Sequence, residues 1–227
     1  MRVSRALLAA LLAIPVAVGA EPGYTYGTAP FTPSYIPPPA GSYELPPIKT
    51  VTDHPVLDEA GGVTSLFAAA GKELSVVAFV YMTCAEATGC PVSTAVLHHL
   101  DRAVAGDAEL HDRVHLVTVS FDPERDTPAT MAAARLHHAP VGDWRFLTTR
   151  DQAMLAPLLQ DFGQQITALQ RADGSATGLF RHVLKVFLLD RQHRIRNSYS
   201  TGFLDPALLV NDLRTVWWGS ITRSARR

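Results

Sequence analysis

The sequence lacks the features that define several large classes of protein. Its 227 residues include only two cysteines, too few for a small domain held together by many disulfides. The 20 basic and 21 acidic residues nearly cancel, so the chain has no sustained positive field for binding nucleic acid. It has no internal repeat, phosphate-binding loop, catalytic serine triad, paired-carboxylate pattern or zinc-protease motif. What remains is one globular domain of ordinary size with additional segments.

The first twenty residues predict an export signal. Arg2 and Arg5 give a positive start, residues 6–18 are apolar, and Ala20 ends a small-residue pattern suited to cleavage. An uncleaved membrane anchor is the alternative, although the apolar run is shorter than the roughly 20 residues that span a bilayer. We expect an exported protein of the bacterial periplasm, where thiols can be oxidised, with contact to the inner membrane only if the signal stays attached.

Residues 21–47 differ in composition from the rest of the chain. They hold eight of its 16 prolines and four of its six tyrosines. Proline removes backbone donors and favours extended polyproline conformation, so we expect a linker that acts as a tether or as a wrapping arm. A proline-rich recognition ligand is the alternative. Residues 48–219 form the expected folded domain, and residues 220–227 form a basic tail.

The expected domain alternates between strand-like and helix-like segments. Continuous apolar, β-branched runs predict buried strands over residues 74–81, 114–121 and 183–189. Proline and capping residues predict helices over residues 91–105, 128–138, 150–162 and 206–217. Shorter elements are expected as strands over residues 49–53, 56–58, 144–147 and 195–199, and as a helix over 64–70. The order predicts an α/β, thioredoxin-like fold: a central mixed sheet flanked by helices, with an N-terminal β-hairpin extension.

Both cysteines follow the first buried strand, in the stretch TCAEATGCPVS. Open sheets of this kind bind ligands at the carboxyl ends of their strands, which is where Cys84 and Cys90 lie. Cys90 comes just before the first turn of the expected helix, whose positive end favours a thiolate. A thiolate is what both metal binding and thiol exchange require. The alternative is an inert disulfide that staples the loop of an exported protein.

Two further residues are candidates for the same site. His182 lies just before the expected strand 183–189, at the sheet edge that faces the cysteines. Monovalent copper favours two thiolates, and an imidazole completes a three-coordinate site that can also hold the oxidised ion. A surface or capping role is the alternative for this histidine. Asp122 ends the strand 114–121 and is expected to orient a ligand or to bind a loop amide. Asp126 and the two residues after it are expected to cap a helix.

Taken together, these motifs resemble the Sco/SenC family, copper-binding thioredoxin-like proteins that assist assembly of the dinuclear copper centre of cytochrome c oxidase. The resemblance extends over about residues 45–218. It rests on the two cysteines with Pro91, on the segment SFDPERDTP at residues 120–128, and on His182, eight residues before Asp190. The resemblance implies that Cys84, Cys90 and His182 are copper ligands and that Asp122 is the family's conserved acidic residue.

The chain departs from the family pattern at two places. Five residues separate Cys84 from Cys90, where the family has three, and Arg181 precedes the histidine where the family usually has aspartate. The chain also lacks the obvious membrane-spanning helix that anchored members of the family have. These departures keep a paralogue specialised for thiol chemistry open as an alternative to a copper-binding protein.

Three functions are therefore considered. The first is a metallochaperone that takes up Cu+ or Cu2+ and passes it to the copper-bearing subunit of cytochrome c oxidase or to another cuproprotein. The second is a thiol-disulfide oxidoreductase in which Cys84 and Cys90 are catalytic and a thiol reductant is the partner. The third is a non-catalytic redox or metal sensor, or a scaffold whose disulfide is only structural.

Overall fold

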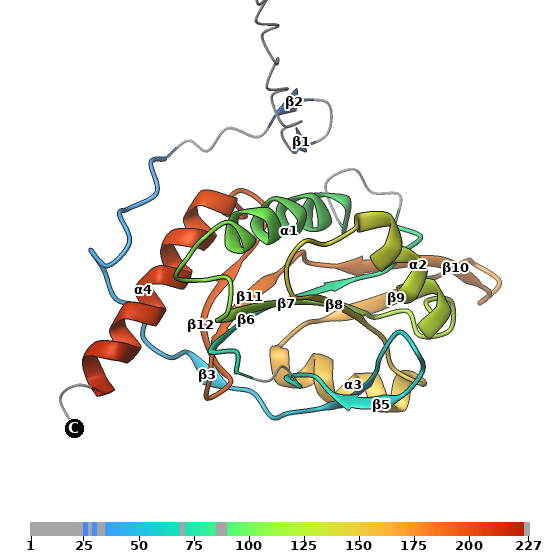
Figure 1. Cartoon of the computed structure of the whole chain (residues 1–227). Coiled ribbons are helices and arrows are strands. Elements are labelled where there is room, and N and C mark those ends of the chain that lie inside the picture. Colours follow the sequence, from blue (N-terminus) through green and yellow to red (C-terminus); the bar gives the residue numbers. More distant parts are fainter. Residues whose placement is uncertain (1–24, 27–28, 31–34, 69–70, 85–89, 225–227) are drawn as a thin grey trace, which may run out of the picture.

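A mixed sheet forms the centre of the structure, a computed structural model that describes residues 25–26, 29–30, 35–68, 71–84 and 90–224. Among these residues, six strands pair in the order β3 (Lys49–Thr50), β12 (Arg194–Tyr199), β11 (Val186–Asp190), β6 (Leu74–Val80), β7 (Val114–Ser120) and β8 (Trp144–Leu147). β6, β7 and β8 are parallel, whereas β11 is antiparallel to both β6 and β12. The predicted α/β, thioredoxin-like arrangement of a mixed sheet flanked by helices is confirmed (Figure 1).

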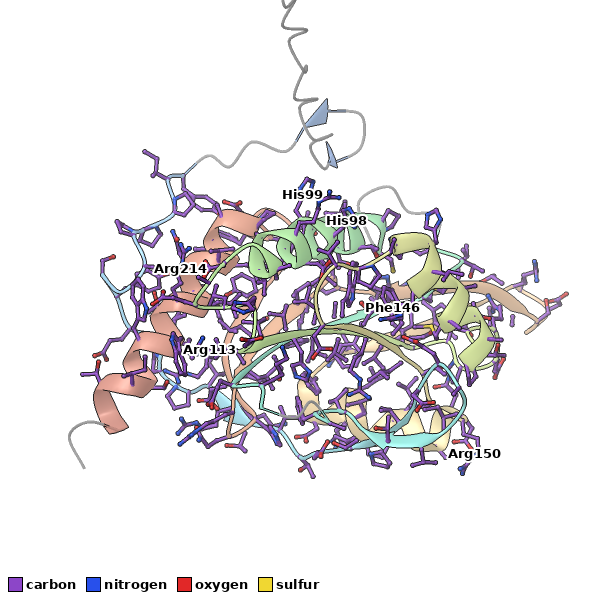
Figure 2. The ribbon with its side chains drawn as sticks, viewed as in Figure 1. His98, His99, Arg113, Phe146, Arg150 and Arg214 are labelled. Carbon is purple, nitrogen blue, oxygen red and sulfur yellow. The ribbon has the colours of Figure 1, made fainter. Side chains whose placement is uncertain are left out.

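Helices cover both faces of this sheet. α1 (Cys90–Ala105), α2 (Pro128–His138) and α4 (Pro206–Ser224) share one apolar core with the sheet, and α3 (Gln152–Phe162) shares the other (Figure 1). Every residue of β6 and of β7 is buried, because these strands lie between the two cores. Figure 2 shows Phe146 of β8 in the interior, where its side chain is fully buried. Within the described ranges, no helix combines the length and apolarity needed to cross a bilayer.

The helix boundaries follow the sequence closely, with one extension. Thr127 caps α2 by accepting a bond from the Thr130 N–H, and Asp151 caps α3 by accepting a bond from the Met154 N–H. α4 continues to Ser224, seven residues beyond its predicted end, so the expected basic tail begins inside a helix. The predicted export signal lies outside the described residues.

The predicted helix over residues 64–70 is wrong. β5 (Val63–Ser65) is instead a strand, paired antiparallel with β4 (Pro55–Leu57), and the two form the N-terminal hairpin. Asp58 holds the turn between them because its Oδ1 accepts bonds from the backbone N–H groups of Ala60 and Gly62 at 3.0 and 2.8 Å. These bonds close the turn that lets the two strands pair. In the sequence, Thr64 and Ser65 alone had indicated the cap of a helix.

A second hairpin was not predicted at all. β9 (Ile166–Gln170) and β10 (Ala176–His182) pair antiparallel as a separate two-stranded sheet. Their register shifts between Ala176 and Phe180, which breaks the alternation on which strand prediction depends. The Asp173-Gly174 pair at the turn was the available signal for a hairpin. His182 precedes the buried strand β11 as predicted, and it also ends β10, which was not predicted.

The proline-rich segment 35–47 packs along α4. Of the two expected forms, a tether and a wrapping arm, this segment has the second. The Gly41 N–H donates to Thr215 Oγ1 at 2.9 Å, and Asn211 Nδ2 donates to the Pro38 carbonyl at 2.9 Å. The Tyr43 hydroxyl donates to Asp212. Further along the arm toward the N-terminus, the two-residue strands β1 (Thr25–Tyr26) and β2 (Ala29–Pro30) pair with each other.

Asp161, near the end of α3, ties the N-terminal part of the domain to this helix. The Thr52 N–H donates to its Oδ2 at 2.6 Å, Lys49 Nζ lies 2.9 Å from Oδ1, and His54 Nε2 lies 3.1 Å from Oδ2. Burial acts to raise the pKa of Asp161, but these three partners outweigh it and lower the pKa to about 2. The ionised carboxylate is thus the form that stabilises the fold.

We expect Asp161→Asn to lower the melting temperature at pH 7, because hydrogen bonds to charged groups contribute about 1.5 to 3 kcal/mol. An unfolded aspartate has a pKa of about 3.9, so this stabilisation is complete above that pH and is lost as the pH falls toward about 2. Thermal unfolding of both proteins across this range measures the effect. A difference in melting temperature that stays constant down to about pH 2 would contradict this prediction.

Candidate metal centre

The two cysteines lie at the junction between β6 and α1. Cys84 follows β6 and is half-buried, and its backbone N–H donates to the Tyr81 carbonyl at 3.2 Å. Cys90 is the first residue of α1 and only 4% exposed. Both are free thiols. The five residues between them lie outside the described part of the chain. The prediction that both cysteines sit at the carboxyl end of a buried strand is thus met by the fold.

The structure brings His182 to this junction. One ligand atom from each of Cys84, Cys90 and His182 lies within 4.8 Å of the other two. No other group of three or more histidine, cysteine, aspartate or glutamate side chains approaches as closely within the described residues. A thiolate-metal bond is about 2.3 Å long, so two atoms on one ion are at most about 4.6 Å apart. Three donors arranged evenly around one ion lie about 4 Å from one another at such bond lengths, so shifts of up to about 1 Å bring all three atoms to one ion.

An aromatic cluster surrounds the imidazole. The ring of His182 lies 5.1 Å from that of Phe121 and 6.1 Å from that of Tyr81, measured between centroids. Phe180, two residues earlier on β10, packs against both of these rings at 5.4 and 5.1 Å. Both ring nitrogens of His182 are shielded from solvent as a result. The cluster holds the imidazole in a dry environment, where a bond to a cation meets little competition from water.

Burial dominates the electrostatics of Cys90. Burial raises the pKa of the Cys90 thiol, and the neighbouring Cys84 raises it further. A hydrogen bond with the backbone of Tyr81 lowers this pKa, but by less. The expectation that the start of the helix would favour a Cys90 thiolate is therefore wrong for the metal-free protein. The neutral thiol is the stable form, and binding of a cation by this sulfur has to release its proton.

Of the two roles predicted for Asp122 and Asp126, binding of a loop amide falls to Asp126, and capping of α2 falls to Thr127. Asp122 is buried and lies 3.4 Å from Arg125 Nη1, and burial raises its pKa against the lowering effect of this guanidinium. Its support of a ligand stays a prediction. Asp126 does not cap α2, which Thr127 does. Instead its Oδ2 accepts bonds from the Met82 N–H at 2.9 Å and the Ser120 hydroxyl at 2.6 Å.

The loop amide expected to contact Asp122 is therefore bound by Asp126. Met82 lies two residues before Cys84, so this carboxylate fixes the chain where it leaves β6 toward the first sulfur. Asp126 is 1% exposed. The sequence signal for this role was the second aspartate of the SFDPERDTP segment, which a helix cap seemed to explain fully.

Solved structures of Sco proteins share this fold. Copper-bound ScoI of Bradyrhizobium japonicum is 23% identical, and the match covers 73% of this chain and 99% of that one, with a TM-score of 0.57. Apo Sco1 of Thermus thermophilus is 23% identical, with 78% and 95% covered and a TM-score of 0.59. Copper-bound ScoI of Arabidopsis thaliana is 17% identical, with 73% and 96% covered and a TM-score of 0.60.

A comparison with curated protein sequences gives no match. The family model described as SCO1/SenC matches residues 47–217, which is most of the chain and includes all three clustered side chains. By this match, the chain belongs to the SCO1/SenC family.

Proposed function

We propose that this protein is a copper chaperone of the Sco type, which delivers copper to cytochrome c oxidase or to another cuproprotein. The observation that carries the proposal is the convergence of Cys84, Cys90 and His182, whose ligand atoms lie within 4.8 Å of one another. Two thiolates suit monovalent copper, and the imidazole adds the nitrogen that divalent copper favours. The donor set therefore fits copper in either oxidation state.

The exposure of the two sulfurs supports delivery rather than permanent storage. Cys84 is half-buried and accessible, whereas Cys90 is 4% exposed. A site with three protein ligands leaves room for a ligand from an acceptor protein to approach copper. We expect the acceptor to approach beside Cys84, and copper to pass by stepwise exchange of ligands. Protons that return to the thiols, above all to buried Cys90, then favour release.

Relatives with solved structures support the choice of cargo and partner. The ScoI proteins of Bradyrhizobium japonicum and Arabidopsis thaliana were solved with copper bound. BsSco is described as a member of the Sco family of cytochrome c oxidase assembly proteins; it is 20% identical to this chain and matches with a TM-score of 0.57. The copper-bearing subunit of an oxidase is accordingly the acceptor that we propose first.

The wider organisation of the chain is part of the proposal. Residues 1–20 direct export to the periplasm, residues 21–47 form the arm, and residues 48–219 form the copper-binding domain. Residues 220–227 form the basic end of the chain. If the signal stays uncleaved, the same segment anchors the domain at the inner membrane.

Thiol-disulfide exchange is the second candidate, because the two sulfurs lie within 4.8 Å of each other and differ in exposure. In this reaction the Cys84 thiolate attacks a disulfide of a partner protein and forms a mixed disulfide. The Cys90 sulfur then displaces the partner's thiol, so two electrons pass to the partner and a Cys84–Cys90 disulfide forms. A thiol reductant would restore the dithiol. A disulfide switch has been identified in BsSco.

We predict that the reduced full chain retains one equivalent of copper through dialysis and shows sulfur-to-copper charge-transfer absorption with Cu2+. Cys84→Ser and Cys90→Ser should abolish this retention, and His182→Ala should weaken Cu2+ binding by about 10-fold or more. His111→Ala is the matched control, because this histidine is exposed and bonded to the Asp107 carbonyl. The chaperone proposal is wrong if the wild type retains no copper.

The second candidate makes a different prediction for the imidazole. His182→Ala should leave the reduction of a partner disulfide unchanged, because thiol exchange needs only the two sulfurs. Turnover of a disulfide-bonded model substrate by the wild type, His182→Ala and Cys84→Ser variants measures this. Substantial turnover by the first two, with none by Cys84→Ser, would favour the oxidoreductase. No turnover by the wild type would exclude it.

A further inference from the structure

The hairpin that carries His182 is not part of the central sheet. Among the described strands, β9 and β10 pair only with each other, whereas Cys84 follows the central strand β6 and Cys90 begins α1. In Figure 1 this hairpin extends to one side of the molecule. The distance from the imidazole to the two sulfurs therefore depends on the contacts that attach the hairpin to the domain, since no continuous sheet fixes it.

Two attachments lie at the base of the hairpin. Gln164, just before β9, donates from Nε2 to the Val183 carbonyl, one residue after His182, at 2.9 Å. Phe180 is 8% exposed and packs against Tyr81 and Phe121. These contacts hold the base of the hairpin against the domain. Neither contact involves the part of β10 that precedes Phe180.

A third attachment reaches that part of β10. Arg125 Nη1 donates to the Gly178 carbonyl at 2.9 Å. Gly178 has a φ of +77°, a conformation that favours glycine, and it lies where the register of the hairpin shifts. A Cβ at this position would be 2.7 Å from Arg125 Nη1. The backbone is thus shaped to bring this carbonyl directly against the guanidinium.

The segment that contains Arg125 also holds the cysteine side of the site. Arg125 Nη1 lies 3.4 Å from Oδ2 of buried Asp122, which braces the guanidinium. One residue later, Asp126 accepts a bond from the Met82 N–H at 2.9 Å, two residues before Cys84. Residues 122–126 therefore contact both the strand that carries the imidazole and the chain that leads to the first sulfur.

We propose that residues 122–126 form a clamp that sets the separation between the His182 imidazole and the two sulfurs, and that Arg125 is its positioning residue. Arg125 acts through Gly178 and touches no ligand. This inference rests on the proposed copper function and adds a residue outside the ligand set. Loss of Arg125 leaves Asp126 to hold the cysteine side, so the two sulfurs stay in place while β10 moves more freely.

The clamp predicts an unequal effect on the two oxidation states of copper. Cu+ is held well by two thiolates, whereas Cu2+ depends more on the imidazole. We therefore expect Arg125→Met to weaken Cu2+ binding by about 10-fold, the lower end of the range for residues that orient metal ligands, while Cu+ binding changes little. The charge-transfer absorption of the Cu2+ form should shift, and amide hydrogen exchange at Phe180 and His182 should accelerate in the metal-free protein.

Arg171→Met is the matched control. Arg171 also donates to a backbone carbonyl of β10, that of Ala176 at 2.6 Å, but at the turn end of the hairpin, away from the site. This variant should keep the copper affinities and the Cu2+ spectrum of the wild type. Gly178→Ala provides a second test, because the added Cβ displaces the guanidinium while Arg125 is kept. It should weaken Cu2+ binding in the same direction.

The measurements separate failure of the clamp from failure of the copper proposal. Wild-type Cu2+ affinity, spectrum and amide exchange in Arg125→Met would overturn the clamp, and so would equal weakening of Cu+ and Cu2+. If the wild type itself bound no copper, the proposed function would fail instead. Amide exchange in the metal-free Arg125→Met and Arg171→Met proteins would still decide whether Arg125 holds β10.

Discussion

Binding of one copper ion requires an imidazole and two sulfur atoms from distant parts of the sequence to meet at one point. Cys84 and Cys90 come from one junction between a strand and a helix, and the packing of β6 and α1 fixes that junction. His182 comes from a hairpin later in the chain, which in the described part of the structure forms a two-stranded sheet separate from the central one. The aromatic rings of Tyr81, Phe121 and Phe180 bridge these two parts, because they pack on one another and around the imidazole.

Burial gives the two sulfurs different tasks. Cys90 lies inside the apolar core that includes α3, and its raised pKa keeps it protonated until a cation displaces the proton. Cys84 packs only at the edge of that core and remains accessible. The same asymmetry suits both transfer of a metal to an acceptor and attack on a partner's disulfide, since each begins at the accessible sulfur. The imidazole is what separates the two functions, because only metal binding needs it.

Much of the fold could be predicted from the sequence, because its buried strands and capped helices carry strong local signals. β6 and β7 are continuous apolar runs, and α2 and α3 begin at capping residues. Hairpin β9–β10 carries no such apolar run, because its residues are largely exposed and the bulge at Gly178 interrupts their alternation, so the Asp173-Gly174 turn was its local signal. The three clustered side chains were predicted from their places beside the expected strands and from the family resemblance. The role of Asp126 was not, since a local capping pattern hid a bond that spans 44 residues of sequence. Long-range bonds of this kind leave no periodic pattern.

X-ray absorption spectroscopy of the copper-loaded wild-type protein tests the central claim most directly, because it identifies the atoms bound to the metal and their distances. We expect two sulfur neighbours at about 2.3 Å and one nitrogen neighbour at about 2.0 Å, with the imidazole scattering pattern absent in His182→Ala. A shell of nitrogen and oxygen atoms without sulfur would contradict it. So would a shell with two sulfurs and an imidazole signal that His182→Ala leaves unchanged.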